Sequence, residues 1–267
     1  MPGSLNIGRQ ALTLECSNNG GPASLLQLVE SPVQLEIEVA ASAATVAALT
    51  SWQARPGEIF SVVGSAGDWY RARLLELSST TACFVPFARI IQSSESSLQL
   101  TVCQALPDKE RFELVLEKLT ELGASRIVPF QSELSTSLAE RDARQKKSHR
   151  WPDLIVKAAK QCRRGMLPEL YPVQSFDQAL YLAAQANLKL MLYEGDCDWP
   201  LTETLDADFT SSVALLIGPE GGFSAAEVSA ARSLGILPVS LGPRILRTET
   251  AAITAAAILQ HRLGDLR

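Results

Sequence analysis

Two glycine-containing loops, each placed directly after a short apolar run, constrain this chain more than any other feature. The first run covers residues 213–217 and is followed by Gly-Pro-Glu-Gly-Gly at 218–222. A continuous apolar run of this length is typical of a strand buried on both faces. The second run covers residues 236–241 and leads into a loop at 242–250. The sequence therefore predicts a strand, a loop, a helix, a second strand and a second loop, in that order.

The helix expected between the two strands has clear start and stop signals. Ser224 and Glu227 have the S-x-x-E spacing of a capping box. Gly235 is placed to end the helix. The side chains that would face the core between them are Val228, Ala231 and Leu234.

The two loops favour a ligand site. Loops that follow neighbouring parallel strands meet at the carboxyl edge of the sheet, where α/β proteins bind their ligands. An ordinary tight turn is the alternative for Gly-Pro-Glu-Gly-Gly taken alone. The second loop makes that alternative weaker, because Arg244, Arg247 and Glu249 are charged residues that an ordinary turn does not need.

Several motifs, taken in order, resemble the signature of one family. The two loops read LLIGPEGGFS and LGPRILRTETAA. Earlier in the chain stand QALP at 104–107, TELG at 120–123, RW at 150–151 and AAKQ at 158–161 followed by Arg163. Together they resemble the SPOUT-superfamily RNA methyltransferases, and most closely the bacterial 16S ribosomal RNA uridine-N3 methyltransferase family. The resemblance is strong over residues 98–267 and weak over 1–97.

The resemblance implies a fold. Residues 98–267 would form an α/β SPOUT domain with a C-terminal trefoil knot, in which the segment after Gly242 passes through a loop of the chain. Residues 1–97 would form a small PUA-like all-β barrel that grips RNA. In this chain Ser51-Trp52-Gln53 stands where the family has Val-Leu-Arg, so a barrel that mainly supports the second domain is the alternative.

The resemblance also implies an activity. A cytoplasmic homodimer would methylate one 16S ribosomal RNA uridine at N3 in the small ribosomal subunit, using S-adenosylmethionine and no metal. The alternatives are methylation of another RNA site and a non-catalytic RNA-binding ribosome-assembly factor. A conventional nucleotide enzyme is disfavoured because neither G-x-G-x-x-G nor G-x-x-x-x-G-K-[ST] occurs.

Site residues follow from the matching positions. Arg247 would stabilise negative charge that develops on the uracil oxygens. Glu249 would orient Arg247, bind the cofactor or accept the proton, and Glu220 would bind the cofactor or cap the helix after it. The full cofactor-binding set is Tyr193, Glu194, Ile217, Gly218, Glu220, Gly221, Gly222, Leu241, Gly242, Arg244, Ile245, Leu246, Thr248, Thr250 and Ala251.

Composition narrows the class of protein. The chain is 46% hydrophobic and 20% charged, which is ordinary for a soluble globular protein. It has no apolar run long enough to span a membrane and no N-terminal signal segment. The five cysteines are scattered and only two histidines occur, which favours reduced thiols over disulfides or a metal site. The net charge of −5 argues against indiscriminate nucleic-acid binding but allows a local basic patch.

The densest basic cluster spans residues 141–164. A helix expected from about Pro152 would place Lys157, Lys160 and Arg164 together on one face. Asp153 is the only acid between residues 143 and 168, so the cluster is expected to be largely unpaired. A solvated surface is the alternative, but the charge favours contact with RNA phosphates. The predicted RNA-binding residues are Arg150, Lys157, Lys160, Arg163 and Arg164.

Other periodic segments complete the expected architecture. Strands are predicted at 35–39, 59–63, 69–77 and 81–87, and a polar break at 93–97 marks the domain boundary. An amphipathic helix ended by Gly123 follows a strand at 98–105 and precedes one at 126–130. Beyond these come a strand at 188–193, an acidic linker at 196–208 and an alanine-rich helix at 251–263.

Overall fold

The computed structural model describes residues 5–7, 10–12, 26–28, 33–91, 94–135, 151–195, 197, 199–205 and 211–267. They form two compact units. The first unit contains the described residues of 1–12, 96–154 and 168–267, and the second contains those of 13–95 and 155–167. The division after Glu95 lies close to the boundary expected at 97/98. The difference is that residues 155–167 join the second unit and the described residues of 1–12 join the first.

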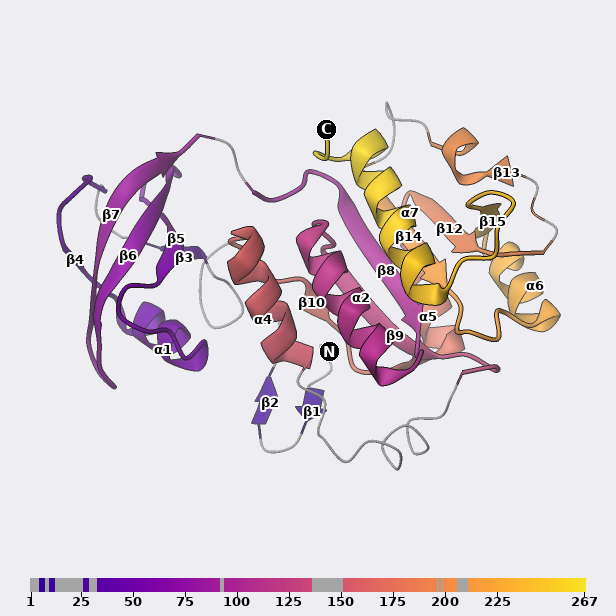
Figure 1. Ribbon diagram of the computed structural model, residues 1–267, viewed down its shortest axis with the longest axis horizontal. Coiled ribbons are helices and arrows are strands. Elements are labelled where there is room, and N and C mark those ends of the chain that lie inside the picture. Colours follow the sequence, from indigo (N-terminus) through magenta and orange to yellow (C-terminus); the bar gives the residue numbers. More distant parts are fainter. Residues whose placement is uncertain are drawn as a thin grey trace. The chain divides into compact units, whose positions relative to one another are not determined.

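The first unit is built on a parallel sheet (Figure 1). Its strands are β8 (Gln99–Ala105), β9 (Arg126–Gln131), β10 (Glu169–Leu170), β11 (Gln174–Ser175), β12 (Leu188–Leu192), β13 (Trp199–Pro200), β14 (Ser212–Ile217) and β15 (Leu237–Ser240). The order is β10-β9-β8-β14-β12-β15-β13, with β11 also paired to β9. Because all these pairs are parallel, the carboxyl ends of β8, β14, β12 and β15 lie at one edge.

Helices cover the two faces of this sheet. On one face lie α2 (Lys109–Glu121) and α7 (Thr248–Leu263), which pack against each other in front of the strands in Figure 1. On the other face, α5 (Phe176–Ala183) and α6 (Ala225–Ser233) share one core with alternate residues of β8, β9 and β14. This arrangement confirms the α/β class. The knot expected after Gly242 stays a prediction.

Most elements expected over 98–267 are confirmed, with three differences. The last helix begins at Thr248 rather than at 251, and the stretch expected as a linker contains β13 and the short 3-10 helix η1 (Leu201–Glu203). Helix α5 was not expected. Its signal is present in the sequence, because Ser175 and Gln178 form a capping box at its start.

The second unit holds a mixed sheet in the order β3-β5-β6-β7-β4. Its strands are β3 (Leu26–Leu28), β4 (Val39–Ala40), β5 (Ile59–Val63), β6 (Trp69–Leu77) and β7 (Ala82–Ile90). The predictions for β5 and β6 are confirmed, and β7 continues three residues beyond the predicted end at 87. Separately, β1 (Leu5–Ile7) and β2 (Gln10–Leu12) form an antiparallel pair.

Two expectations for the N-terminal region are wrong. The strand predicted at 35–39 is mostly a turn, in which Glu36 has φ 61, and only Val39 belongs to β4. The region is also not all-β, because α1 (Ala43–Ser51) begins after Ser42, whose hydroxyl accepts the N–H of Thr45. Closure into a PUA-like barrel stays a prediction.

The helix expected from about Pro152 is α4 (Trp151–Cys162). Pro152 lies in its first turn, where a missing N–H costs no helical hydrogen bond. None of the helices in the described ranges is long and apolar enough to cross a membrane.

Candidate active site

The two glycine-containing loops meet at the carboxyl edge of the sheet of the first unit. A cleft of about 910 Å³ lies there, beyond the ends of β14, β12 and β15. Its walls are the loop after β14, the turn after β12 and the loop that joins β15 to α7. The convergence expected of residues 217–222 and 241–251 is therefore confirmed.

Aromatic packing and a capping box hold the first loop. The Phe223 ring stacks on Phe130 with centroids 6.4 Å apart, and lies 6.2 Å from the Phe176 ring. The hydroxyl of Ser224 accepts the N–H of Glu227, and the Glu227 carboxylate accepts the N–H of Ser224 at 3.0 Å, which confirms the predicted box. These contacts fix the loop between β14 and α6.

One hydroxyl joins the second loop to the first. The side chain of Thr248, at the start of α7, donates to the carbonyl oxygen of Gly218 at 2.6 Å. The Thr248 hydroxyl in turn accepts a hydrogen bond of 2.9 Å from Nε2 of Gln104 on β8. Thr248 and Gln104 are both buried. Three segments far apart in the sequence are thus bonded at one point beside the cleft.

We expect Thr248→Val to destabilise the protein by about 1 to 3 kcal/mol. Valine has nearly the same shape but no hydroxyl, so the carbonyl of Gly218 loses its buried donor. Urea denaturation followed by circular dichroism measures the change. Thr248→Ser is the matched control, because it keeps the hydroxyl; equal losses in both variants would show that the methyl group, not the hydrogen bond, matters.

The backbone conformation of Gly222 favours glycine. Its φ is 73, in the left-handed region that side chains disfavour. A Cβ at this position would also meet the carboxylate of Glu194, an exposed side chain after β12 that would have to turn away. The absence of a side chain therefore leaves room for the Glu194 carboxylate beside the first loop at the wall of the cleft.

Charged groups gather at one end of the cleft. Arg111 on α2 lies 3.2 Å from Oε1 of Glu220 and 3.9 Å from Oε2 of Glu249. The Glu249 side chain is 13% exposed, and its Oε2 is buried without a hydrogen-bond partner. Arg247 is the exposed N-cap residue of α7, and within the described ranges no ion pair joins it to Glu249. The described contact of the Glu249 carboxylate is therefore the ion pair with Arg111.

Glu220 serves neither as the cap of α6 nor as an isolated loop residue. The cap of α6 is the Ser224–Glu227 pair. The carboxylate of Glu220 instead accepts the N–H of Asp108, the N-cap residue of α2, at 3.3 Å. Glu220 thus ties the first loop to the start of α2.

Most of the predicted ligand-binding residues line the cleft. These are Tyr193, Glu194, Ile217, Gly218, Glu220, Gly222, Leu241, Gly242, Arg244, Ile245, Leu246, Arg247, Thr248 and Ala251. Gly221, Glu249 and Thr250 are not among the lining residues. Sequence reasoning missed Arg111 and Arg232, which also line it. Their signals are weak, because a single arginine on a helix carries no motif.

The basic cluster is less open than expected. Lys160 pairs with Glu58 at 2.8 Å, and Arg164 pairs with Glu95 at 2.9 Å. Arg164 is only 6% exposed and follows the end of α4, so it does not share a helix face with Lys157. The expectation of unpaired charge is therefore wrong for these two residues.

Lys157 and Arg163 are exposed. Arg150 and the basic residues at 141–147 lie outside the described residues.

The described residues contain no cluster of His, Cys, Asp and Glu side chains that could hold a metal ion. No disulfide joins the described cysteines. Burial raises the pKa of the Cys103 thiol to about 12, so this thiol is neutral at physiological pH.

A parallel sheet with two loops around a cleft at its carboxyl edge places the first unit among the α/β proteins that bind a small ligand at this edge. Comparison with known proteins narrows this class. Residues 94–260 match the family model described as RNA methyltransferase domain. The chain belongs to this RNA methyltransferase family.

Individual relatives agree with this assignment. The chain is 30% identical to ribosomal RNA small subunit methyltransferase E of Buchnera aphidicola subsp. Schizaphis graminum over 195 residues, which are 73% of this chain and 78% of that protein. Against the Bacillus subtilis protein of the same name, it is 30% identical over 181 residues, 66% of this chain and 71% of that one. A solved structure of the Neisseria gonorrhoeae protein of this name, bound to S-adenosylmethionine, has a TM-score of 0.67 and 28% identity, over 91% of this chain and 99% of that chain.

Proposed function

We propose that this protein transfers a methyl group from S-adenosylmethionine to N3 of a uridine in 16S ribosomal RNA of the small subunit. The observation that carries the proposal is the meeting of the two loops around one cleft, with Arg247 and Glu249 at the start of α7. RNA methylation follows from the family. The ribosomal RNA substrate is supported by the names of the relatives, and the choice of uridine N3 by the motif resemblance.

The lining of the cleft suits this cofactor. Apolar side chains of Ile217, Leu241 and Leu246 can pack on an adenine ring, while the glycines at 218 and 222 leave backbone groups accessible. The Glu194 carboxylate is part of this lining, and Glu249 directly follows the lining residue Thr248 in the chain. Both can accept hydrogen bonds from hydroxyl or amino groups of the ligand. Bound S-adenosylmethionine supplies a sulfonium-activated methyl group, so the protein needs no covalent nucleophile.

Arg247 is placed to act on the uracil. Uridine N3 lies on the pairing edge of the base, so the base must be unpaired before it enters the cleft. Loss of the N3 proton leaves negative charge on the neighbouring uracil oxygens. The Arg247 guanidinium, held at the N-terminus of α7, can stabilise that charge as it develops.

Of the three roles expected for Glu249, we retain two in this proposal. The possibility that it orients Arg247 is not supported, because it lies beside Arg111 instead. It can accept a hydrogen bond from the cofactor or receive the N3 proton. Its partly buried position, with one oxygen lacking a hydrogen-bond partner, is compatible with both.

The assembly and location belong to the proposal as well. The alanine face of α7 is used inside the chain, since Ala252, Ala255 and Ala256 are fully buried in the single subunit. Homodimer formation therefore rests on the resemblance, as does a cytoplasmic location. Lys157 and Arg163 are the described residues of the basic cluster that we assign to RNA contact, because both are exposed.

The direct test uses labelled S-adenosylmethionine and small subunits that lack the modification. We expect label in 3-methyluridine after nucleoside digestion. Label in another nucleoside would point to a different RNA site. No label despite calorimetric binding of the cofactor would overturn the proposal and favour a non-catalytic RNA-binding factor.

A further inference from the structure

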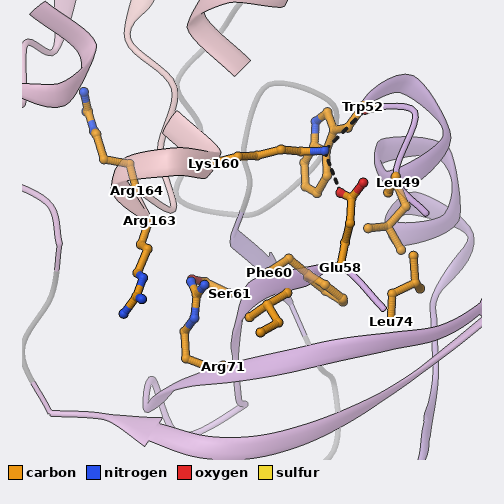
Figure 2. A pocket seen from close by; sticks show the side chains of 12 residues that line it. Leu49, Trp52, Glu58, Phe60, Ser61, Arg71, Leu74, Lys160, Arg163 and Arg164 are labelled. Atoms are coloured by element: carbon orange, nitrogen blue, oxygen red, sulfur yellow. Dashed lines mark hydrogen bonds and ion pairs between the residues drawn. The ribbon is translucent and has the colours of Figure 1, made fainter. Parts of the chain in front are cut away.

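A small pocket in the second unit brings together two arginines from distant parts of the sequence (Figure 2). Arg71 lies on β6, and Arg163 follows the end of α4. Both side chains point into the same pocket in Figure 2, beside Ser61. We call this group of three residues the Arg71–Arg163 pocket. The enclosed volume is only about 20 Å³, so a ligand larger than water would rest at its mouth.

The sheet fixes Arg71 in this orientation. Ser61 on β5 stands directly opposite Arg71 on β6, which places both side chains on one face. Nη1 of Arg71 donates to the Ser61 hydroxyl at 3.0 Å. One edge of the guanidinium is thus held by the protein, which leaves its other donors for a ligand.

Lys160 and Arg164, the neighbouring cations in the pocket, are paired with carboxylates, whereas Arg71 and Arg163 have no such partner among the described residues. Lys160 is bonded to the Glu58 carboxylate and the Trp52 carbonyl, and Arg164 is bonded to Glu95. Within the described part of the chain, no carboxylate lies within ion-pair distance of Arg71 or Arg163. Burial, and to a lesser degree the charge of Arg163, lowers the pKa of Arg71 below its usual value. Two guanidinium groups that repel each other form an environment that an anion would stabilise.

The backbone of Arg163 supports a role for its side chain. Its φ of 64 lies in the left-handed region, at the position after a helix where glycine is favoured. The N–H groups of Arg163 and Arg164 bond to the carbonyls of Lys160 and Ala159, which is the Schellman arrangement. An arginine here is conformationally strained where glycine would not be. The geometry therefore offers no backbone reason for arginine.

We propose that Arg71, Arg163 and Ser61 form a binding subsite for one backbone phosphate of the RNA substrate. Two guanidinium groups can donate to several oxygens of one phosphate, and the contact is independent of base sequence. This subsite belongs to the second unit and is additional to the cleft that binds the cofactor. It rests on the proposed function only for the identity of the anion as RNA.

The test measures the affinity of the full-length protein for a short single-stranded RNA by fluorescence anisotropy at several KCl concentrations. Arg71→Gln and Arg163→Gly should each weaken binding about tenfold at moderate salt. Each should also reduce the slope of log Kd against log [KCl] by about 0.7. If both residues hold one phosphate, the double variant should lose less than the product of the single losses. Arg163→Gly should melt at the same or a higher temperature, so that misfolding cannot explain its loss.

Arg73→Gln is the matched control. Arg73 lies on the same strand and carries the same charge, but its guanidinium lies over the Phe87 ring instead of lining the pocket. Its RNA affinity should change less than about twofold. An equal loss in Arg73→Gln would show diffuse attraction and overturn the subsite, as would parental affinity in Arg71→Gln and Arg163→Gly.

Two further measurements are needed. One distinguishes free phosphate from RNA phosphate as the ligand of the pocket, and the other distinguishes a failure of the subsite from a failure of the proposed function. If inorganic phosphate raises the melting temperature of the parent but not of Arg71→Gln, while RNA affinity is equal in both, the pocket takes free phosphate and the RNA assignment is wrong. Calorimetric binding of S-adenosylmethionine should be unchanged in all variants. A parent that binds RNA through this pocket yet forms no 3-methyluridine would contradict the proposed function and leave the subsite intact.

Discussion

Arg247→Ala is expected to lower the rate of methyl transfer by about 10²- to 10³-fold, with cofactor affinity nearly unchanged. The guanidinium is exposed in the cleft, and its side chain makes no capping hydrogen bond to α7. Its removal should therefore leave the fold intact. The loss should appear in turnover, because charge on the uracil oxygens develops only as the reaction proceeds.

Single-turnover assays with labelled cofactor and small subunits measure this loss, and calorimetry measures cofactor binding. Arg262→Ala is the matched control, since Arg262 is an exposed arginine at the opposite end of the same helix. Arg247→Lys should recover part of the rate, because it restores the charge without the planar fork. Parental turnover in Arg247→Ala would remove Arg247 from the mechanism.

Gly222→Ala should weaken S-adenosylmethionine binding about tenfold, equivalent to about 1.4 kcal/mol. The residue would be held at an unfavourable φ of 73, and the new methyl group would push the exposed Glu194 carboxylate aside. Because Gly222 and Glu194 both line the cleft, turning the exposed Glu194 side chain away takes its carboxylate out of the position beside the first loop. Isothermal titration calorimetry with the cofactor gives the result directly.

The control for backbone strain is Gly67→Ala. Gly67 has a similar φ of 82, but a Cβ there meets no atom within 4 Å. Both variants should lose similar stability from strain, about 1 to 2 kcal/mol, whereas only Gly222→Ala should lose cofactor affinity. If both retain full cofactor affinity, the position of the Glu194 carboxylate beside Gly222 is not needed for binding.

Local signals in the sequence were sufficient for much of the cleft. The apolar run at 213–217, the capping box of Ser224 and Glu227, and the terminal Gly235 together specify one strand, one loop and one helix. These signals operate over a few residues, so they can be read without knowledge of the partners. The parallel order of β14, β12 and β15 then places the loops at one edge.

Interactions between distant residues could not be predicted in this way. The basic cluster contains little acid in its own stretch, yet Lys160 pairs with Glu58 and Arg164 with Glu95. Arg111 reaches Glu220 and Glu249 from a helix with no motif of its own. A knot likewise has no local signature, since it is a property of the path of the whole chain.

The hydroxyl of Thr248 joins Gln104 on β8 to Gly218 after β14, and this link has a consequence for biosynthesis. A ribosome makes β8 and β14 well before it makes α7, so a growing chain can assemble the sheet while the loop before α7 is still untethered. Competence to take up the methyl donor would then be acquired only after α7 has been made and has docked.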